Sequence, residues 1–571
     1  MIILSQLCTV VRQKLNEQKK QTAMSQNQIA LIALISPLLF IATAIVSWFQ
    51  PGSRPIMLKQ MSLIVGLLGI GTAVISGYFV FQHGLIQSSL IGLNNFGLSI
   101  RLDAISITML TMIALLAFIV LKFSNNYMDG DDRQGSFTGR LAATIASVQL
   151  LVISGNLGLL FVAWVFTSIS LHRLLLFYPE RPGAIIAARK KFILARIGDA
   201  SLLVAIALLY NQFGSGNLEV IFNELKTNVY SINVEIAAFC LVLAALFKSA
   251  QFPTHGWLIE VMETPTPVSA LLHAGLLNAG PYLIVRMAFV MDASIYAPLL
   301  LIAVGGFTAL FASVVFLTQS SIKTALGYSS VAHMGFSLMV CGLGVYPAAM
   351  LHLVAHSFYK AHAFLSTGSV IDGIRASKIA KAERIGSPIR IATGIALALL
   401  VYSIFAFAWG INPESEFGLL ALGAVIILGI SRIFTSAIDS NGNFTLFLRA
   451  VFFALIVTTA FFSLESGMHY VLGTQIPALS PPSMATIILT STILLLFTAA
   501  VFIQIIAPTL NPSPKFNALA IHLRNGLYMN AAFDKLVGTY NINLKPNDTP
   551  LQKEQINAEI ESEVELVPIR K

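Results

Sequence analysis

Charged side chains are scarce in this sequence. Only 11% of its 571 residues are Asp, Glu, Lys or Arg, whereas soluble domains average about 25%. Hydrophobic residues make up 56%, and they come in successive runs of about 20 residues, each long enough to cross a hydrocarbon core of about 30 Å as a helix. This composition excludes a soluble enzyme, a nucleic-acid-binding protein and a secreted disulfide scaffold. The predicted fold is all-α and polytopic, surrounded by membrane lipid and without a nucleic-acid partner.

Grouped metal ligands and nucleotide-binding loops are also missing from the sequence. Cys8, Cys240 and Cys341 lie far apart and form no CxxC pair, whereas iron–sulfur, haem and structural zinc sites need closely spaced ligands. Gly69 and Gly71 lie inside an apolar run without the third glycine of a dinucleotide loop. The sequence therefore predicts no metal site and no cofactor in this chain.

The apolar runs predict about fifteen membrane spans, most of them without charged residues. The run from Leu141 to Tyr178 is too long for one span, and Gly155 followed by Asn156 is the expected turn within it. Between the second and third spans, the Asn94-Asn95 pair predicts a short outer hairpin in 84–103. The expected spans are 29–49, 62–83, 104–123, 141–155, 157–178, 193–210, 233–252, 267–289, 295–317, 323–344, 347–371, 388–409, 418–438, 447–464 and 485–507.

Basic residues indicate how the chain is oriented, because Lys and Arg collect in cytoplasmic loops. The segments 179–196 and 372–390 each hold five of them, so we expect both to be cytoplasmic, with the C-terminus inside and the N-terminus outside. The segment 1–28 disagrees, because it carries four basic residues. Either Met24 is the true start or 1–28 contains an amphipathic segment on the membrane surface. The segment 1–28 lacks the cleavage site of a signal peptide. In the polar tail, 516–543 is a candidate segment for docking a partner.

Ionisable residues at membrane depth are functional hypotheses, because an unpaired charge there costs several kcal/mol. Lys248 ends an apolar run, and Pro253 five residues later lacks a backbone donor, so a helix break is expected there. A lysine beside such a break can exchange protons; the alternative is a lysine whose stem lies in the apolar layer and whose ammonium reaches water. His273 lies well inside its span, either as a buried core residue or in a water-lined position.

The sequence also places three titratable residues on one helix face. His352, His356 and Lys360 are spaced four residues apart, one turn each. Two groups that titrate near neutrality and lead to a cation form the outline of a proton wire, which His333 extends. Zinc ligation is the alternative, but no HExxH glutamate or third ligand lies nearby in the sequence.

Two carboxylates stand at the starts of predicted spans. Asp199 and Glu235 fit an interfacial position or an ion pair as well as a role in transport. Arg196 lies three residues before Asp199, which favours an ion pair between these two.

Two long motifs resemble the signature of the proton-conducting membrane transporter family. They are KSAQFPTHGW at 248–257 and PTPVSALLHA at 265–274. This family contains the antiporter-like subunits of respiratory complex I and the large subunit of Mrp-type sodium/proton antiporters. Shorter matches are RLDA at 101–104, RIGD at 196–199, LGYS at 326–329 and HLVAHSFYKA at 352–361, and the resemblance covers about 60–440.

The resemblance implies two inverted repeats of five helices with broken helices near the membrane middle. It also implies a proton path that runs through Lys248, His273, His352, His356 and Lys360. The segments expected on this basis are an N-terminal polar extension (1–28), N-terminal helices with the outer hairpin (29–140), a first antiporter-like repeat (141–290), a second antiporter-like repeat (291–440), C-terminal helices (441–508) and a cytoplasmic tail (509–571).

Departures from the complex I pattern indicate a particular branch of the family. Val165 stands where complex I subunits carry a glutamate that faces the first lysine, and 398–412 lacks their late-span lysine. The stretches 164–175 and 181–192 instead resemble the membrane subunit of the DAB inorganic-carbon transporter.

That resemblance implies a membrane subunit in the inner membrane of a bacterium that conducts protons or sodium and is not itself an enzyme. A soluble zinc partner, similar to a β-carbonic anhydrase, would hydrate carbon dioxide to bicarbonate on the cytoplasmic face. Three alternatives stay open: an antiporter-like subunit of an NAD(P)H–quinone oxidoreductase, an independent cation/proton antiporter, and a scaffold whose channel has decayed.

Overall fold

A computed structural model describes residues 26–227, 231–261, 264–368, 388–438, 444–506 and 514–537. The extension up to residue 25, most of the basic segment 372–390 and the tail beyond residue 537 carry predictions made above and lie outside the described residues. Met24, the alternative start, lies there too.

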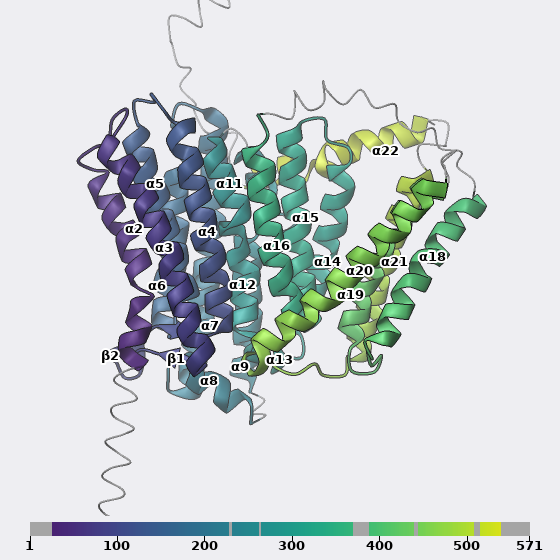
Figure 1. Ribbon diagram of the computed structural model, residues 1–571, viewed down its shortest axis with the longest axis horizontal. Helices are drawn as coiled ribbons and strands as arrows, with labels where there is room; N and C mark the ends of the chain where they lie inside the picture. The colour runs from purple at the N-terminus through teal and green to yellow at the C-terminus, as the bar shows by residue number, and fades with distance from the viewer. Residues whose placement is uncertain are drawn as a thin grey trace, which may run out of the picture.

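Helices make up nearly all of the described chain, and most of them stand side by side (Figure 1). The long helices are α2 (Ile35–Val46), α3 (Ile56–His83), α4 (Ala104–Tyr127), α5 (Gln134–Val152), α6 (Leu157–Leu175), α7 (Pro182–Phe213), α9 (Ile232–Lys248), α14 (Ala297–Phe316), α15 (Ile322–Gly342), α16 (Tyr346–Leu365), α18 (Pro388–Ala408), α19 (Phe417–Ile438), α20 (Phe444–Leu472) and α21 (Met484–Ile506). Shorter helices are α8 (Leu218–Leu225), α10 (Gly256–Glu260), α11 (Thr266–Ala274), η2 (Leu276–Asn278), α12 (Ala279–Arg286), α13 (Ala288–Asp292), α22 (Pro514–Arg524) and α23 (Met529–Val537).

Ten helical segments among the described residues are long and apolar enough to cross a membrane. They confirm the prediction of a polytopic helical membrane protein, whereas the total of about fifteen spans and the inverted repeats stay predictions. These segments are Gln26–Val46, Ile56–His83, Ala104–Tyr127, Leu157–Leu175, Gly183–Phe213, Thr266–Arg286, Ala297–Phe316, Phe417–Ile438, Phe444–Gln475 and Met484–Gln504.

The segment Thr266–Arg286 forms the centre of the molecule. All residues of its most apolar 18-residue stretch are buried, whereas the shares for Phe444–Gln475 and Met484–Gln504 are 17% and 11%, so these two lie at the periphery. α20 runs obliquely across the other helices and contacts α16 and α4 (Figure 1). With α18 and α19 it encloses a small apolar cluster, separate from the main core.

Two helices of the central region are interrupted. α9 ends at Lys248, and Pro253 lies in the non-helical stretch before α10. Ala250 within that stretch has a positive φ of 51°. A second interruption at Gly275 separates α11 from η2 and α12. Irregular backbone at membrane depth is tolerated where protein surrounds it, and α11 and η2 are buried throughout.

The hairpin expected in 84–103 joins β2 (Ile91–Leu93) to β3 (Phe96–Leu98) through Asn94 and Asn95, whose φ angles are 50° and 61°. Two positive φ values are what a tight two-residue hairpin turn requires. The neighbouring strands β1 (Ile86–Gln87) and β4 (Arg101–Leu102) also pair.

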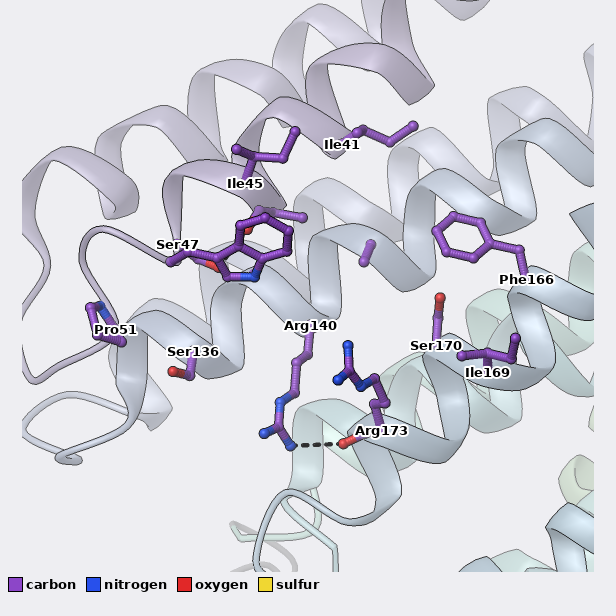
Figure 2. Close-up of a pocket in the computed structure, with 14 residues that line it drawn as sticks. Ile41, Ile45, Ser47, Pro51, Ser136, Arg140, Phe166, Ile169, Ser170 and Arg173 are labelled. Atoms are coloured by element: carbon purple, nitrogen blue, oxygen red, sulfur yellow. Dashed lines mark hydrogen bonds between the residues drawn. The ribbon is translucent and has the colours of Figure 1, made fainter.

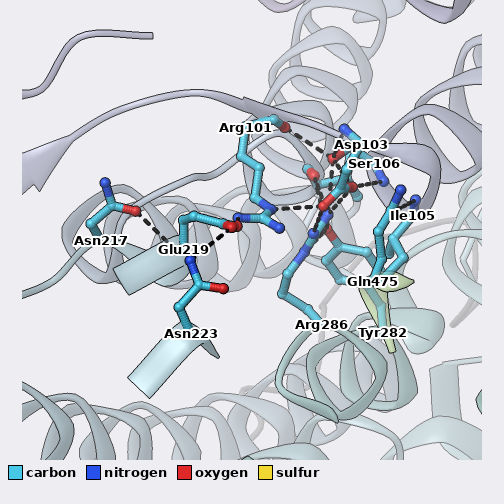
Figure 3. Close-up of polar contacts among 11 residues, drawn as sticks. Arg101, Asp103, Ile105, Ser106, Asn217, Glu219, Asn223, Tyr282, Arg286 and Gln475 are labelled. Atoms are coloured by element: carbon cyan, nitrogen blue, oxygen red, sulfur yellow. Dashed lines mark hydrogen bonds and ion pairs between the residues drawn. The ribbon is translucent and has the colours of Figure 1, made fainter. Parts of the chain in front are cut away.

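An ion-pair network fastens this hairpin end to the bundle (Figure 3). The carboxylate of Asp103 accepts hydrogen bonds from Arg101 Nε at 2.7 Å and Arg286 Nη1 at 2.5 Å. It also caps α4 by accepting from the Ser106 amide at 2.8 Å, while Arg101 reaches Glu219 of α8 at 2.5 Å. Burial alone would raise the pKa of Asp103, but the two guanidinium groups lower it below its ordinary value. The network therefore joins the hairpin, α4, α8 and α12.

One predicted loop is wrong. Residues 182–192, expected as part of a cytoplasmic segment, form the first turns of α7. Pro182 suits the first turn of a helix, and two of the basic residues, Lys190 and Lys191, are buried instead of hydrated. Both find polar partners inside the protein, described below, which is why the helix extends through them.

The C-terminal helices fold back onto the chain's own surface. α22 lies across the end of the molecule opposite β1 and β2 (Figure 1), and α23 contacts α10. Lys190 Nζ lies 2.6 Å from Glu260 Oε1 and 3.1 Å from Asn530 Oδ1, and it also pairs with Asp534. Asn530 Nδ2 donates to the same Glu260 oxygen at 2.8 Å. We call these four residues the tail clamp. The described part of 516–543, predicted to dock a partner, thus docks on this chain.

Candidate functional site

Lys248, at the end of α9, is held entirely by α6. Its Nζ donates to the Trp164 carbonyl oxygen at 3.1 Å and to the hydroxyls of Thr167 and Ser168, both at 2.7 Å. The ammonium also lies 4.3 Å from the centroid of the Trp164 ring, a cation–π distance. Three acceptors match the three donors of the ammonium group, so the side chain is satisfied inside the protein.

Two further ionisable residues of α7 surround this lysine. Asp199 is 7% exposed and lies 2.5 Å from Arg196, the predicted ion pair, and its charge also interacts with that of Lys248. Lys191 donates to the Ser168 carbonyl oxygen at 2.6 Å. A cavity of about 20 Å³ lined by Lys191 and Lys248 lies among these groups, large enough for one water molecule.

His273 lies on α11, deep in the centre of the molecule. Its side chain is fully buried and stacks on Phe364 at 4.4 Å between ring centroids. Neither ring nitrogen has a hydrogen-bond partner in the described part of the chain. Buried polar atoms are nearly always paired with protein or water, so these nitrogens indicate a position where water or a proton is accommodated.

Asn278 connects the second helix interruption to α16. Its amide nitrogen donates to the Ala274 carbonyl oxygen at 3.0 Å and to the Ser357 hydroxyl at 2.6 Å. Ser357 in turn donates to the Leu353 carbonyl oxygen. This polar link joins the segment after α11 to the helix that carries His352 and His356.

The histidines of α15 and α16 form one cluster. His333 Nδ1 and His352 Nε2 are 3.3 Å apart, within hydrogen-bond distance. The His356 ring centroid lies 4.9 Å from that of His333 and 5.9 Å from that of His352. His356 is 4% exposed, and within the described residues its ring nitrogens have no partner. One turn further on, the fully buried Lys360 donates to the Leu326 carbonyl oxygen at 3.1 Å.

The histidine cluster opens to the surface at one end. A groove of about 420 Å³ is lined by His333 and His352 together with Ser313, Ser329 and mostly apolar side chains. The row thus leads from a surface groove to the buried Lys360. Among the described residues, no group of His, Cys, Asp and Glu could hold a metal ion.

Glu235 lies apart from these residues. Its carboxylate accepts hydrogen bonds from the Ser294 hydroxyl at 2.9 Å and from the backbone amides of Ile295 and Tyr296 at 2.9 Å and 3.1 Å. It therefore fastens the start of α9 to the turn that precedes α14. The ion pair considered for Glu235 is not found in the part of the chain that the structure describes.

Three polar residues of these regions were not singled out by sequence. Lys191 was assigned to a loop, and Asn278 carries no charge at neutral pH. Glu465 lies in α20 and is 8% exposed, one residue past the predicted end of its span. A carboxylate within the apolar run 444–472 was the signal that could have identified it.

Comparison with known proteins gives this arrangement its context. Residues 154–406 match the family of NADH:quinone oxidoreductase/Mrp antiporter transmembrane domains, and 90–138 match the N-terminus of complex I chain 5. A probable inorganic carbon transporter subunit DabB2 from Halothiobacillus neapolitanus is 36% identical over 520 residues, which are 89% of this chain and 93% of that protein. The chain belongs to this antiporter-like family. Membership confirms the resemblance stated from the motifs and makes the chain a membrane transport subunit.

Other relatives span the branches of the family. A probable inorganic carbon transporter subunit DabB from Hydrogenovibrio crunogenus is 37% identical over 65% of this chain and 71% of that protein. Subunit L of NADH-quinone oxidoreductase from Campylobacter jejuni is 34% identical over 60% of this chain, which spans 57% of that subunit.

Solved structures agree on the fold. The Mrp complex from Dietzia sp. DQ12-45-1b has a TM-score of 0.52 at 22% identity over 96% of this chain and 60% of the matched one. The membrane-bound sulfane sulfur reductase, an archaeal respiratory complex, has a TM-score of 0.54 at 19% identity over 90% and 99%.

Proposed function

We propose that the chain is the membrane subunit of an energy-coupled inorganic carbon uptake complex in the inner membrane of a bacterium. The observation that carries ion conduction is the row of His333, His352, His356 and Lys360, which begins at a surface groove and ends at the buried His356 and Lys360. Similarity to three probable inorganic carbon transporter subunits supports the carbon branch, and the first of these matches extends over nearly the whole of both chains.

The proposed proton path has two polar clusters with a connection between them. Lys248 accepts and releases the proton in the first cluster, with Asp199 as its counter-ion in place of the carboxylate that is absent at Val165. His273 connects this cluster to the second in this proposal, because it is fully buried and stacks on Phe364 of α16, the helix that carries His352, His356 and Lys360. Two inverted five-helix repeats, within about fifteen spans, would place both clusters near the membrane middle.

The partner in this proposal is a soluble zinc protein similar to a carbonic anhydrase, bound on the cytoplasmic face. A zinc-bound hydroxide there would attack carbon dioxide, and proton flow through the membrane subunit would remove the released proton and favour bicarbonate. The basic segments 179–196 and 372–390 lie at the proposed cytoplasmic side, as does the C-terminus.

The substitution His356→Ala tests the histidine row. We expect cells that make both proteins to lose uptake of radiolabelled bicarbonate, while the amount of assembled complex stays unchanged. His362→Ala is the matched control, because His362 lies on the same helix but is exposed. Normal uptake by the His356→Ala variant would contradict the proposed path.

A subunit of an NAD(P)H–quinone oxidoreductase, or a separate cation/proton antiporter, is the second candidate, favoured by the 34% identity to subunit L. Purification of the tagged chain in mild detergent separates the candidates. A single soluble partner with bound zinc supports the carbon transporter, a large assembly with flavin and iron–sulfur centres supports the oxidoreductase, and recovery of the chain alone supports the antiporter.

A further inference from the structure

A groove of about 640 Å³ lies between the end of α2, the start of α5 and the end of α6 (Figure 2). It is separate from the lysine and histidine clusters described above, and the proposed function does not use it. One end is basic, with Arg140 and Arg173, and the rest is lined mainly by apolar side chains such as Ile41, Ile45 and Phe166. A groove that is basic at one end and apolar along the rest fits an amphipathic ligand.

The basic end carries positive charge without an acidic partner. Arg140 Nη1 donates to the Arg173 carbonyl oxygen at 2.8 Å and to that of Leu176 at 3.4 Å, so its charge is fixed in place but not neutralised. Among the described residues neither Arg140 nor Arg173 forms a salt bridge, whereas the neighbouring Arg133 pairs with Glu180 at 2.8 Å. In Figure 2 the two side chains lie next to each other, with the Arg140 guanidinium turned toward the end of α6 and that of Arg173 toward the groove, so an anion between them would be attracted by both.

The hydroxyl groups of Ser136 and Ser170 also line the groove, and hydroxyls donate hydrogen bonds to phosphate oxygens. Trp48 lines it too and is 75% exposed. Exposed tryptophan is typical of the membrane–water interface, where its ring lies at headgroup level. The basic end therefore lies at the depth of lipid headgroups.

The apolar wall extends away from this end along α6. Phe166 and Arg173 are separated by seven residues, which correspond to about 10 Å along a helix. Ile45 and Ile169, on facing helices, are 44% and 45% exposed, so this wall is open to the surrounding bilayer. This wall is long enough for the upper part of an acyl chain to pack along it. A free phosphate ion would occupy only the basic end and would leave the apolar wall uncovered.

We propose that this groove binds one anionic phospholipid. The phosphate lies between Arg140 and Arg173, and an acyl chain packs along Ile45, Phe166 and Ile169. The groove lies at the same end of the molecule as Arg181 and Arg189, two exposed arginines at the start of α7, because α5 begins and α6 ends there. Anionic lipids are attracted to such basic surfaces.

Native mass spectrometry of the purified full-length chain tests the proposal, with phosphatidylglycerol, phosphatidylcholine and glycerol 3-phosphate as probes. We expect phosphatidylglycerol to be retained at least about tenfold more tightly than phosphatidylcholine, and glycerol 3-phosphate not to be retained. The double substitution R140Q/R173Q should abolish this preference, while R432Q/R449Q, at two exposed arginines of α19 and α20, should preserve it.

A second variant separates lipid binding from folding. Ala143→Phe leaves both arginines unchanged and fills the apolar part of the groove, which Ala143 lines, so it should also abolish retention. Unchanged preference for phosphatidylglycerol in folded R140Q/R173Q would overturn the proposal. Equal retention of glycerol 3-phosphate would overturn it too, since the site would then bind a small anion without an acyl chain.

Discussion

At the scale of single residues, the proposed counter-ion of Lys248 is Asp199, because the sequence carries no carboxylate at Val165. Asp199 lies on α7, where it pairs with Arg196 at 2.5 Å and its charge also acts on Lys248, whereas a carboxylate at Val165 would lie on α6. A carboxylate from a different helix can neutralise the same ammonium group, because the pairing depends on distance and not on position in the chain.

The substitution Asp199→Asn tests this pairing. Asparagine removes the negative charge that acts on Lys248, and each change of about 1.4 kcal/mol is a factor of ten, so we expect proton flux through proteoliposomes to fall by about tenfold or more. A pH-sensitive dye inside the vesicles measures the flux. Asp292→Asn, at an exposed aspartate of α13, is the control, and equal flux in both variants would remove Asp199 from the path.

Arg286 belongs to the buried ion-pair network around Asp103, and we expect its substitution to change stability. The substitution Arg286→Met would leave Asp103 with one buried arginine partner instead of two, and breaking a buried ion pair costs about 3–5 kcal/mol. We expect a clearly lower melting temperature of the purified chain in detergent. Arg133→Met breaks an exposed pair, in which both side chains are 45% exposed, and should change stability by about 1 kcal/mol or less.

The stability difference between the original chain and Arg286→Met depends on pH, and the lowered pKa of Asp103 sets the sign of that dependence. A carboxylate with a lowered pKa in the folded state stabilises the protein above its unfolded pKa, and this contribution is lost as the pH falls through the folded value. The difference between the original chain and Arg286→Met should therefore stay constant from neutral pH down to about pH 5 and shrink below about pH 4. A difference that shrinks between pH 7 and 5 would contradict this assignment.

At the scale of helices, the sequence predicts the elements that depend on local pattern. The expected spans 157–178 and 347–371 correspond to helices that begin within one residue of those limits, because apolar length and turn residues are local properties. The break around Pro253 follows from the missing backbone donor. The interruption at Gly275 was not predicted, because it depends on long-range contacts such as that of Asn278 with α16.

For the same reason, the sequence predicts only part of the candidate site. Spacing along α16 places His356 and Lys360 on one face, but the closeness of His333 to His352 and of Asp199 to Lys248 depends on how helices pack. Packing of this kind has no periodic signature in the sequence.

The tail clamp gives an element-scale prediction. Lys190→Met would leave the carboxylates of Glu260 and Asp534 close together without their shared cation, and like charges repel. We expect α23 to detach, so that backbone amides of 529–537 exchange with deuterium at least about tenfold faster. Lys535→Met, at an exposed lysine of the same helix, should leave exchange unchanged. Unaltered exchange in the Lys190→Met variant would show that other contacts hold α23.

At the scale of the whole molecule, the proposed function separates ion conduction from zinc chemistry. A zinc chelator should stop bicarbonate uptake by the assembled complex, because the hydration step needs the metal of the partner. The same chelator should leave proton flux through proteoliposomes of this chain alone unchanged, since its described residues contain no metal-binding group. Loss of flux on chelation would place a metal in the conduction path itself.

The tail clamp can form only late in biosynthesis, because its residues lie far apart in the chain. Lys190 and Glu260 are 70 residues apart, whereas Lys190 and Asn530 are 340 residues apart. At about 5–20 residues per second, the ribosome supplies Glu260 about 4–14 s after Lys190 but Asn530 only after about 20–70 s. The surface around α10 therefore stays uncovered while the 270 residues from Glu260 to Asn530 are made. If translation ends before α23 is made, this surface stays uncovered permanently. Such a truncated product differs from the finished protein at that surface.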